Sequence, residues 1–292
     1  MNDALDRVQA VLPERYKLEK ELHRSGLATF YRARDLEHAH PVTIKVVGPH
    51  IEGTAGKRFV RECGFLAKLE HPLIAKVLDV GVSAGFCYLV TPYLDGETLR
   101  ERLDREGQIP IDAAVKIVCD VADALCYAHE NYVIYRDVKP ERVTLVAGNA
   151  IISDFGLYYA AEDFGDEGPA VYFKGTPCYA SPEHITGGEL VGAGSDVYSL
   201  GVLLYEMLAG KFPFEGVSVA AMMKRILIET PPSLRVVRPE VPEQLANVVE
   251  VAMAKKLDQR FQTMAEFRAA LAGSLDESGR PPRKAWWRLP WL

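Results

Sequence analysis

The stretch YRDVKPE, residues 135–141, decides the fold of this chain. It follows a segment, residues 110–130, whose apolar side chains recur every three or four positions. That spacing predicts one long helix with a single buried stripe. Two ionisable side chains, Asp137 and Lys139, therefore lie in a polar turn directly after a buried helix.

Six further motifs surround this stretch in a fixed order. VTIK at 42–45 ends a predicted strand, and Glu62 lies on a predicted helix. Beyond the stretch come DFG at 154–156, GTPCYASPE at 175–183, SDVYSLG at 195–201 and LDQRF at 257–261. Seven motifs in this order are too many for a chance match. Together they resemble the bacterial serine/threonine protein kinases along nearly the whole chain.

The resemblance implies a role for each motif residue. Lys45 would hold the α- and β-phosphates of ATP, and Glu62 would orient that lysine. Asp137 would accept the proton of the substrate hydroxyl, and Lys139 would neutralise the transferring phosphoryl group. Asp154 would bridge the phosphates through Mg²⁺.

Three other positions also carry over from the family. Lys139 together with Thr176 resembles the serine/threonine rather than the tyrosine branch, so Thr176 is counted with the catalytic residues. The family pairs the residues at Arg260 and Glu183. Tyr135 replaces the leading histidine of the family's catalytic loop, a change also found in active kinases that resemble the cyclic-AMP-dependent type.

The fold class implied is α+β: the bilobal protein-kinase fold, with a small antiparallel-sheet N-lobe carrying one helix and a larger, mainly helical C-lobe. We expect an N-terminal helical extension at 1–15, an N-lobe at 16–94, a C-lobe at 95–273 and a basic, tryptophan-rich tail at 274–292. The expected strands are three between 16 and 47, two near 74–82 and 86–93, and short ones near 133, 144 and 151. The expected helices are 3–11, 55–69, 110–130, 194–209, 217–228, 242–256 and 263–272.

The glycine-rich loop of the family is altered here. His23, Ser25 and Ala28 stand where the family has three glycines, which let the backbone approach the phosphates closely. Ala28 is a mild change, since many bacterial kinases have alanine there. His23 and Ser25 place side chains where the loop would close over ATP. Ser25 and Ala28 still count among the expected nucleotide-binding residues.

The adenine pocket is altered as well. Phe30 replaces a valine and Thr43 an alanine in its roof, and Thr144 replaces a leucine-like residue in its floor. A phenylalanine in the space of a valine could cost ~1–3 kcal/mol if the site does not relax. Each ~1.4 kcal/mol lowers affinity tenfold. The residues expected to line the rest of the pocket are Thr91, Pro92 and Leu94.

Arg142 is the largest departure from the family. The family has an asparagine there, which gives an oxygen to the second Mg²⁺, whereas arginine is only a donor. At about 4 Å and an effective dielectric near 20, a +1 charge repels a +2 ion by ~8 kcal/mol, a ceiling because the side chain can swing away. Alternatively, Arg142 binds phosphate directly and substitutes for the lost metal.

Composition narrows the class of protein further. The formal net charge of −6 argues against a general nucleic-acid binder. Five cysteines without CxxC spacing suggest neither a disulfide framework nor a zinc site, so reduced thiols in a cytoplasmic protein are expected. The start of the chain lacks the apolar core of a signal peptide, and no stretch has the length of a membrane span.

Two segments leave alternatives open. Residues 155–175 contain no serine or threonine but several acids, which either imitate a phosphate or form a solvated acidic loop. Residues 280–292 hold three tryptophans and four basic residues. Such a tail either folds back on the domain or makes a weak contact with an anionic membrane surface, which would make the protein peripheral there.

Three functions follow from these observations. One is an active ATP-dependent serine/threonine kinase acting on a protein substrate. The second is a pseudokinase that regulates a protein partner, or a weakly active regulatory kinase. The sequence slightly favours the second, because the departures cluster on the nucleotide and Mg²⁺ site while the acid–base residues survive. The third, a small-molecule kinase of related fold, fits the docking motif at 175–183 less well.

Overall fold

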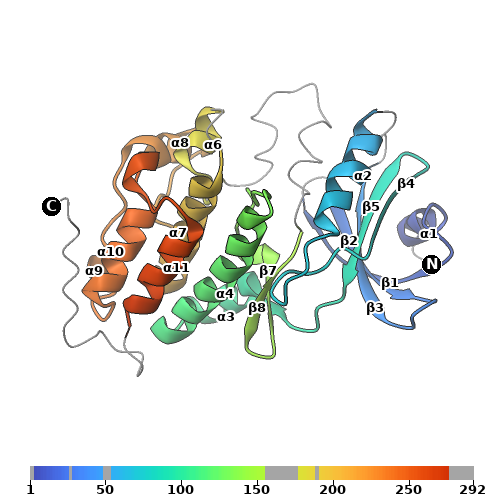
Figure 1. Ribbon diagram of the computed structural model, residues 1–292, viewed down its shortest axis with the longest axis horizontal. Helices are drawn as coiled ribbons and strands as arrows, with labels where there is room; N and C mark the ends of the chain where they lie inside the picture. Colours follow the sequence, from blue (N-terminus) through green and yellow to red (C-terminus); the bar gives the residue numbers. More distant parts are fainter. Residues whose placement is uncertain (1–2, 26–27, 49–53, 155–176, 188–190, 276–292) are drawn as a thin grey trace. The chain divides into compact units, whose positions relative to one another are not determined.

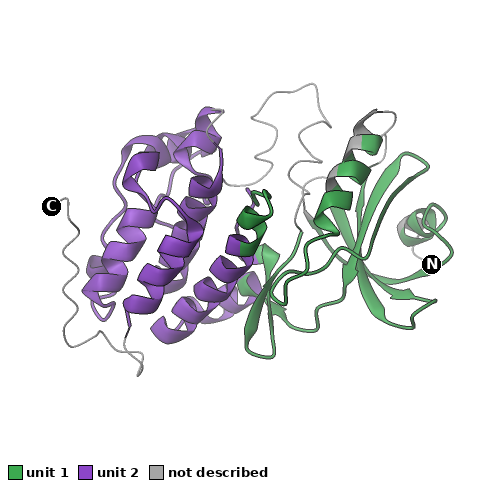
Figure 2. Ribbon diagram, in the orientation of Figure 1, with its two compact units in different colours: residues 1–99, 127–135, 141–176 green, residues 100–126, 136–140, 177–292 purple. Residues whose placement is uncertain are grey.

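The computed structural model describes residues 3–25, 28–48, 54–154, 177–187 and 191–275. The chain forms two compact units, which Figure 2 colours separately. Unit 1 comprises residues 1–99, 127–135 and 141–176, and unit 2 comprises residues 100–126, 136–140 and 177–292. The limits of the N-lobe and C-lobe given above stay a prediction.

Unit 1 contains an antiparallel sheet of five strands in the order β1-β2-β3-β5-β4 (Figure 1). Apolar side chains at alternate positions of β1, β2, β3 and β5 point to one face and form a buried cluster, as the two-residue period of a strand requires. Helix α2 (Thr54–Leu66) packs against β4 and β5. The strands are β1 (Tyr16–Ser25), β2 (Ala28–Asp35), β3 (Pro41–Val47), β4 (Asp79–Ser83) and β5 (Phe86–Pro92).

The N-terminal helix α1 (Asp3–Gln9) covers part of the buried cluster, against which Leu5 and Val8 pack. Its last residue, Gln9, is bound to strand β1. The side-chain amide of Gln9 donates to the carbonyl oxygen of Tyr16 at 2.9 Å, and its side-chain oxygen accepts from the backbone N–H of Leu18 at 2.7 Å. The extension is therefore fixed to the sheet through both apolar and polar contacts.

A second sheet of unit 1 positions the site. It has the order β6 (Glu97–Thr98), β7 (Val143–Val146), β8 (Asn149–Ile152). Ala147 and Gly148 join β7 to β8 with φ of 48° and 82°, as expected for a two-residue hairpin turn whose twist matches the strands. The 3₁₀ helix η1 (Pro140–Arg142) directly precedes β7. The hairpin thus brings the residues that follow β8 close to Arg142, which precedes β7.

Unit 2 is built from helices. Helix α7 (Ala193–Ala209) is buried from Ser195 onward, and α9, α10 and α11 pack against it. Helix α4 (Ile111–Glu130) contributes all but its last turn to this unit. The other helices are α3 (Leu99–Glu106), α6 (Pro182–Thr186), α8 (Val219–Ile228), α9 (Leu234–Val237), α10 (Glu243–Ala252), η3 (Leu257–Gln259) and α11 (Met264–Gly273).

The predicted fold class is confirmed: an antiparallel sheet with one packed helix is combined with a helical unit. The predicted strand near 133 is wrong. The backbone N–H of Val133 bonds to the carbonyl of Ala128 at 2.9 Å, and Tyr132 has a φ of 61°, which is the geometry of a helix end. The strand expected from 74 begins only at Asp79. Among the described residues, no helix has the length and apolar character that a membrane crossing requires.

Candidate active site

In unit 1, the buried side chains of Lys45 and Arg142 both contact the buried carboxylate of Asp154. Lys45 Nζ forms an ion pair with Oδ1 of Asp154, and Arg142 Nη1 donates a hydrogen bond to Oδ2 of the same group. Lys45 has 2% of its surface exposed, Asp154 6% and Arg142 7%. Both oxygens of the Asp154 carboxylate are therefore occupied by cationic groups of the chain itself.

Local structure brings these three groups together. Lys45 lies near the end of β3, and Asp154 follows β8 by two residues. The backbone N–H of Ser153 bonds to the carbonyl of Arg142 at 2.9 Å, so the β7–β8 hairpin fixes the distance between Arg142 and Asp154. Asp154 itself has a φ of 69°, a conformation that aspartate tolerates better than most residues and that is common at functional sites.

Among the described side chains of this cluster, Lys45 and Arg142 face the single carboxylate of Asp154. Burial lowers the pKa of Lys45 well below its usual value, and the charge of Arg142 lowers it further. Lys45 and Arg142 therefore disfavour each other's charge, and both side chains are buried beside the Asp154 carboxylate. A further cation would raise the repulsion between them, whereas an anion would lower it.

Phe30 closes this cluster from β2. It lies directly opposite Lys45 in the β2–β3 ladder and is buried. Its ring centroid lies 5.8 Å from Lys45 Nζ and 5.8 Å from Arg142 Cζ, which is cation–π range. On β1, His23 stacks on the Phe30 ring with centroids 4.1 Å apart. The two departures at His23 and Phe30 therefore form one aromatic pair beside the charged groups.

The other expected nucleotide-binding residues of unit 1 lie on the same two sheets. Thr91 is buried on β5 and faces Thr43 across the ladder, with Pro92 ending that strand and Leu94 half-buried just beyond it. Ala28 is buried at the start of β2, opposite Ser25. Thr144 is half-buried on β7 and pairs with Thr98 of β6.

Unit 2 carries the predicted catalytic loop. Lys139 Nζ contacts Oδ1 of Asp137 at 2.7 Å, and both side chains are partly exposed. The backbone N–H of Arg136, whose φ is 65°, bonds to Oδ1 of Asp196 at 2.8 Å. Because Asp196 lies in the buried first turn of α7, the loop is held in this unusual backbone conformation by the core of unit 2.

The predicted pair of Glu183 and Arg260 is present. Arg260 Nη1 and Nη2 donate to the two carboxylate oxygens of Glu183 at 2.7 and 2.8 Å, and Ser195 Oγ donates at 2.6 Å. Burial raises the pKa of Glu183, but the hydrogen bonds from Arg260 and Ser195 outweigh it and lower the pKa to about 2. The pair ties the docking segment after residue 177 to the η3 segment.

Several predicted site residues lie outside the described residues. The backbone of Glu62 is part of α2, but its side chain is not described, so the predicted ion pair of Lys45 with Glu62 stays a prediction. The same applies to the side chain of Ser25. Thr176, the acidic loop at 155–175 and the tail at 280–292 also lie outside the described part of the chain.

The described residues do not fit a magnesium ion at Asp154. Mg²⁺ needs carboxylate oxygens whose lone pairs face the ion, and it keeps near-ideal octahedral geometry. Here Lys45 and Arg142 use both oxygens of Asp154, and an arginine cannot itself be a ligand. Lys45 and Arg142 are, by contrast, the residue types that bind phosphate.

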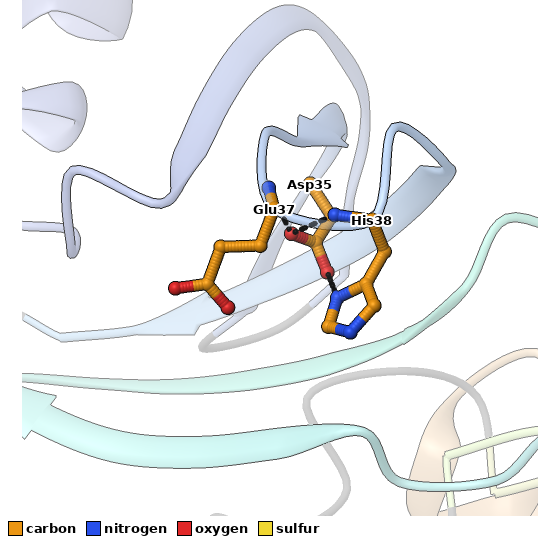
Figure 3. Close-up of side chains that lie close together, drawn as sticks. All are labelled: Asp35, Glu37 and His38. Atoms are coloured by element: carbon orange, nitrogen blue, oxygen red, sulfur yellow. Dashed lines mark hydrogen bonds and ion pairs between the residues drawn. The ribbon is translucent and has the colours of Figure 1, made fainter.

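A second group of metal-type side chains lies on the turn between β2 and β3 (Figure 3). Donor atoms of Asp35, Glu37 and His38 lie within 4.8 Å of one another. Arg15, however, donates two hydrogen bonds to Asp35, at 3.0 and 2.7 Å, and pairs with Glu37 at 3.2 Å. Hydrogen bonds from Arg15 hold the pKa of Asp35 well below its usual range. Arg15 thus engages both carboxylates, and this cluster serves as an anchor of the sheet rather than as a metal site.

Sequence reasoning named two further motif residues, Tyr135 and Asp196, without predicting the contacts that they make. Tyr135 is a buried member of the catalytic motif whose hydroxyl donates to the carbonyl of Ser153 at 2.6 Å. Asp196 supports the backbone of Arg136 from α7. A signal for Asp196 was present, because Asp196 lies in a predicted helix that is mostly apolar, and a buried ionisable residue must find a partner.

The chain matches the protein kinase domain family over residues 16–270. Among curated proteins, it is 38% identical over 280 residues to the serine/threonine-protein kinase PknB of Mycobacterium leprae, covering 93% of this chain and 44% of PknB. It is 31% identical over 266 residues to the serine/threonine-protein kinase PrkC of Bacillus subtilis, covering 90% of this chain and 41% of PrkC. The chain thus spans less than half the length of these relatives.

Solved structures agree with the fold. The kinase domain of Mycobacterium tuberculosis PknI matches with a TM-score of 0.70 and 26% identity, covering 89% of this chain and 95% of that one. A structure of Rad53 in complex with AMP-PNP matches with a TM-score of 0.75, covering 87% of this chain and 64% of that one. At 21% identity, the match to Rad53 supports only the assignment of the fold.

Proposed function

Because the chain belongs to the protein kinase domain family, we propose that it is a serine/threonine-kinase-like regulatory domain with an impaired nucleotide site, that is, a pseudokinase or a weakly active kinase. The family uses ATP and magnesium and acts on proteins, so the partner of this domain is a protein. Its part is to bind and regulate that protein, with phosphoryl transfer weak or lost.

The observation that carries this proposal is the pairing of Arg142 and Lys45 with Asp154. Phosphoryl transfer depends on positioning and on cations that neutralise the charge developing on the phosphates. In this chain the carboxylate that should hold a metal is engaged by Arg142, and Phe30 occupies space beside it. The impaired step is therefore the binding of the metal at Asp154, whereas the acid–base residues Asp137 and Lys139 are kept.

A second candidate, an active serine/threonine protein kinase, is favoured by unit 2. Asp137 and Lys139 are in contact, and the backbone of Arg136 is held by Asp196. The Glu183–Arg260 pair is also intact. These features support substrate orientation, and they persist in a domain that has lost only its metal site.

The test is a phosphotransfer assay on the purified chain with labelled ATP, Mg²⁺ or Mn²⁺, and a generic protein substrate. We expect at most trace incorporation into the chain or the substrate, close to that of Asp137→Asn. Incorporation well above that control, and abolished by Asp137→Asn, would establish the active kinase instead. Arg142→Asn is the matched gain-of-function variant, because it restores an oxygen ligand and removes the positive charge.

Location in the cytoplasm, with a weak contact of residues 280–292 with anionic membranes, belongs to the same proposal and rests on the sequence. Trp286 and Trp287 beside Arg283, Lys284 and Arg288 motivate it. Cosedimentation of the chain with anionic vesicles should decrease with salt and be lost when residues 280–292 are removed. Equal cosedimentation with neutral vesicles would remove the idea.

A further inference from the structure

We propose that Arg142 takes the place of a divalent cation at Asp154, and that unit 1 binds a nucleoside triphosphate in its metal-free form, with the phosphates held by Lys45 and Arg142. This inference rests on the proposed function, since it concerns the same impaired site. It states what the site binds once the metal has been lost.

The first argument is geometric. A metal at Asp154 would have to displace Arg142 from Oδ2 or Lys45 from Oδ1. Both side chains are buried. The hydrogen bond from the backbone N–H of Ser153 to the carbonyl of Arg142 holds Arg142 near Asp154. The guanidinium group is planar, stays charged and offers five N–H donors, so it can bridge a carboxylate and a phosphate as a metal does.

The second argument is charge. Among Lys45, Arg142 and Asp154, positive charge exceeds negative charge, and all three are withdrawn from water. Adding Mg²⁺ increases the excess, whereas adding a polyphosphate reverses it. ATP without a metal brings no further cation to Arg142 and Lys45, whereas the magnesium complex does.

The third argument concerns Phe30. Its ring lies at 5.8 Å from both cations, on the side of the cluster formed by β2. The negative face of an aromatic ring is a weak substitute for an anion. Phosphates that bind Lys45 and Arg142 compete with this ring, so entry of the nucleotide requires the Phe30 side chain to turn away.

The experiment is calorimetric titration of the whole chain with ATP, once in EDTA and once in excess MgCl₂. We expect binding in EDTA to be tighter than in MgCl₂, by about tenfold or more. Arg142→Asn should reverse the preference, since it removes the cation and supplies an oxygen. Arg34→Asn, which removes an exposed arginine of β2 in the same unit, is the matched control and should leave both affinities unchanged.

Two additional titrants separate the parts of the ligand. Inorganic tripolyphosphate should bind the parent in EDTA and lose about tenfold in affinity on Arg142→Asn, whereas adenosine should be indifferent to that change. Phe30→Ala should strengthen binding of tripolyphosphate. Circular dichroism of each variant establishes that it is folded before it is titrated.

The inference is overturned if MgCl₂ strengthens ATP binding to the parent, or if neither ATP nor tripolyphosphate binds in EDTA. Either result leaves the proposed function standing when the phosphotransfer assay shows no activity. Conversely, Mg²⁺-dependent phosphotransfer well above that of Asp137→Asn would end the proposed function, and metal-stimulated ATP binding would then accompany it. The two failures are therefore distinguishable.

Discussion

The hydroxyl of Tyr135 donates a hydrogen bond of 2.6 Å to the backbone carbonyl of Ser153, the residue directly before Asp154. Tyr135 belongs to the catalytic motif and is buried, so a single side chain links this motif to the segment that presents the charged cluster.

Tyr135→Phe should lower the free energy of unfolding by about 1 kcal/mol, because the half-buried carbonyl of Ser153 loses its donor. Urea denaturation monitored by circular dichroism measures the change. Tyr132→Phe is the control: Tyr132 is 96% exposed, and removing its hydroxyl should have no measurable effect. An equal loss of stability in both variants would mean that the Ser153 bond contributes nothing.

Asp154→Asn should destabilise the chain by about 3–5 kcal/mol, since it leaves Lys45 and Arg142 buried without their carboxylate. Adding Arg142→Asn to that variant should recover part of the loss, with a coupling of about 0.5–3 kcal/mol in the double-mutant cycle. Chemical denaturation of the parent, both single variants and the double variant gives the cycle. Strict additivity would show that the Arg142–Asp154 contact is not energetically significant.

Arg260→Met should cost about 3–5 kcal/mol, because it leaves the buried carboxylate of Glu183 unpaired. Arg268→Met, which breaks the half-exposed pair with Asp123, should cost no more than about 1 kcal/mol. Thermal and urea unfolding of the two variants compare the pairs directly. Similar losses for the two would contradict the importance assigned to burial.

The Glu183 carboxyl should make the chain sensitive to acid. Its pKa is lowered from 4.5 to about 2 in the folded state, so its contribution to stability is fully present above 4.5 and is lost as the pH falls toward 2. Glu183→Gln should remove this contribution and flatten the fall in stability across that range. The measurement is the free energy of unfolding at a series of pH values. A parallel fall in parent and variant would assign the acid sensitivity to other groups.

Phe30→Val combined with Thr144→Leu should recover adenosine binding, because adenine recognition depends chiefly on shape and apolar contact. The Phe30 change alone removes a buried ring and should cost up to about 3 kcal/mol of stability. Calorimetric titration with adenosine, which has no phosphates, isolates the adenine pocket from the charged cluster. Failure of the double variant to bind adenosine would place the block elsewhere.

Much of the fold could be predicted from the sequence, because apolar periodicity and motif order are local signals. The strands between Tyr16 and Val47 and the long helix α4 were found in this way. The turn at Tyr132 and Val133 was not, because an apolar residue after a helix also suits a strand. Short elements such as α3 and α9 were missed, since a few turns carry too little pattern to be recognised.

The residues of the candidate site could be predicted from the sequence, but the contacts between them could not. The motifs identified Lys45, Asp137 and Asp154, and the departure at Arg142 was visible as a wrong chemical type for a metal ligand. What could not be predicted is that Arg142 would bind the Asp154 carboxylate directly, or that His23 would stack on Phe30. Both contacts join neighbouring strands or turns of a hairpin, and they depend on side-chain directions that the sequence pattern does not give.

The carboxamide of Gln9 affects how readily one molecule can add a strand to the sheet of another. Strand β1 is an edge of its sheet, and an edge strand offers backbone N–H and C=O groups that another chain can pair with. Gln9 binds the C=O of Tyr16 and the N–H of Leu18, which are groups that an incoming strand would use. Helix α1 thus protects the sheet against strand addition, and a chain lacking its first residues would be prone to aggregate through β1.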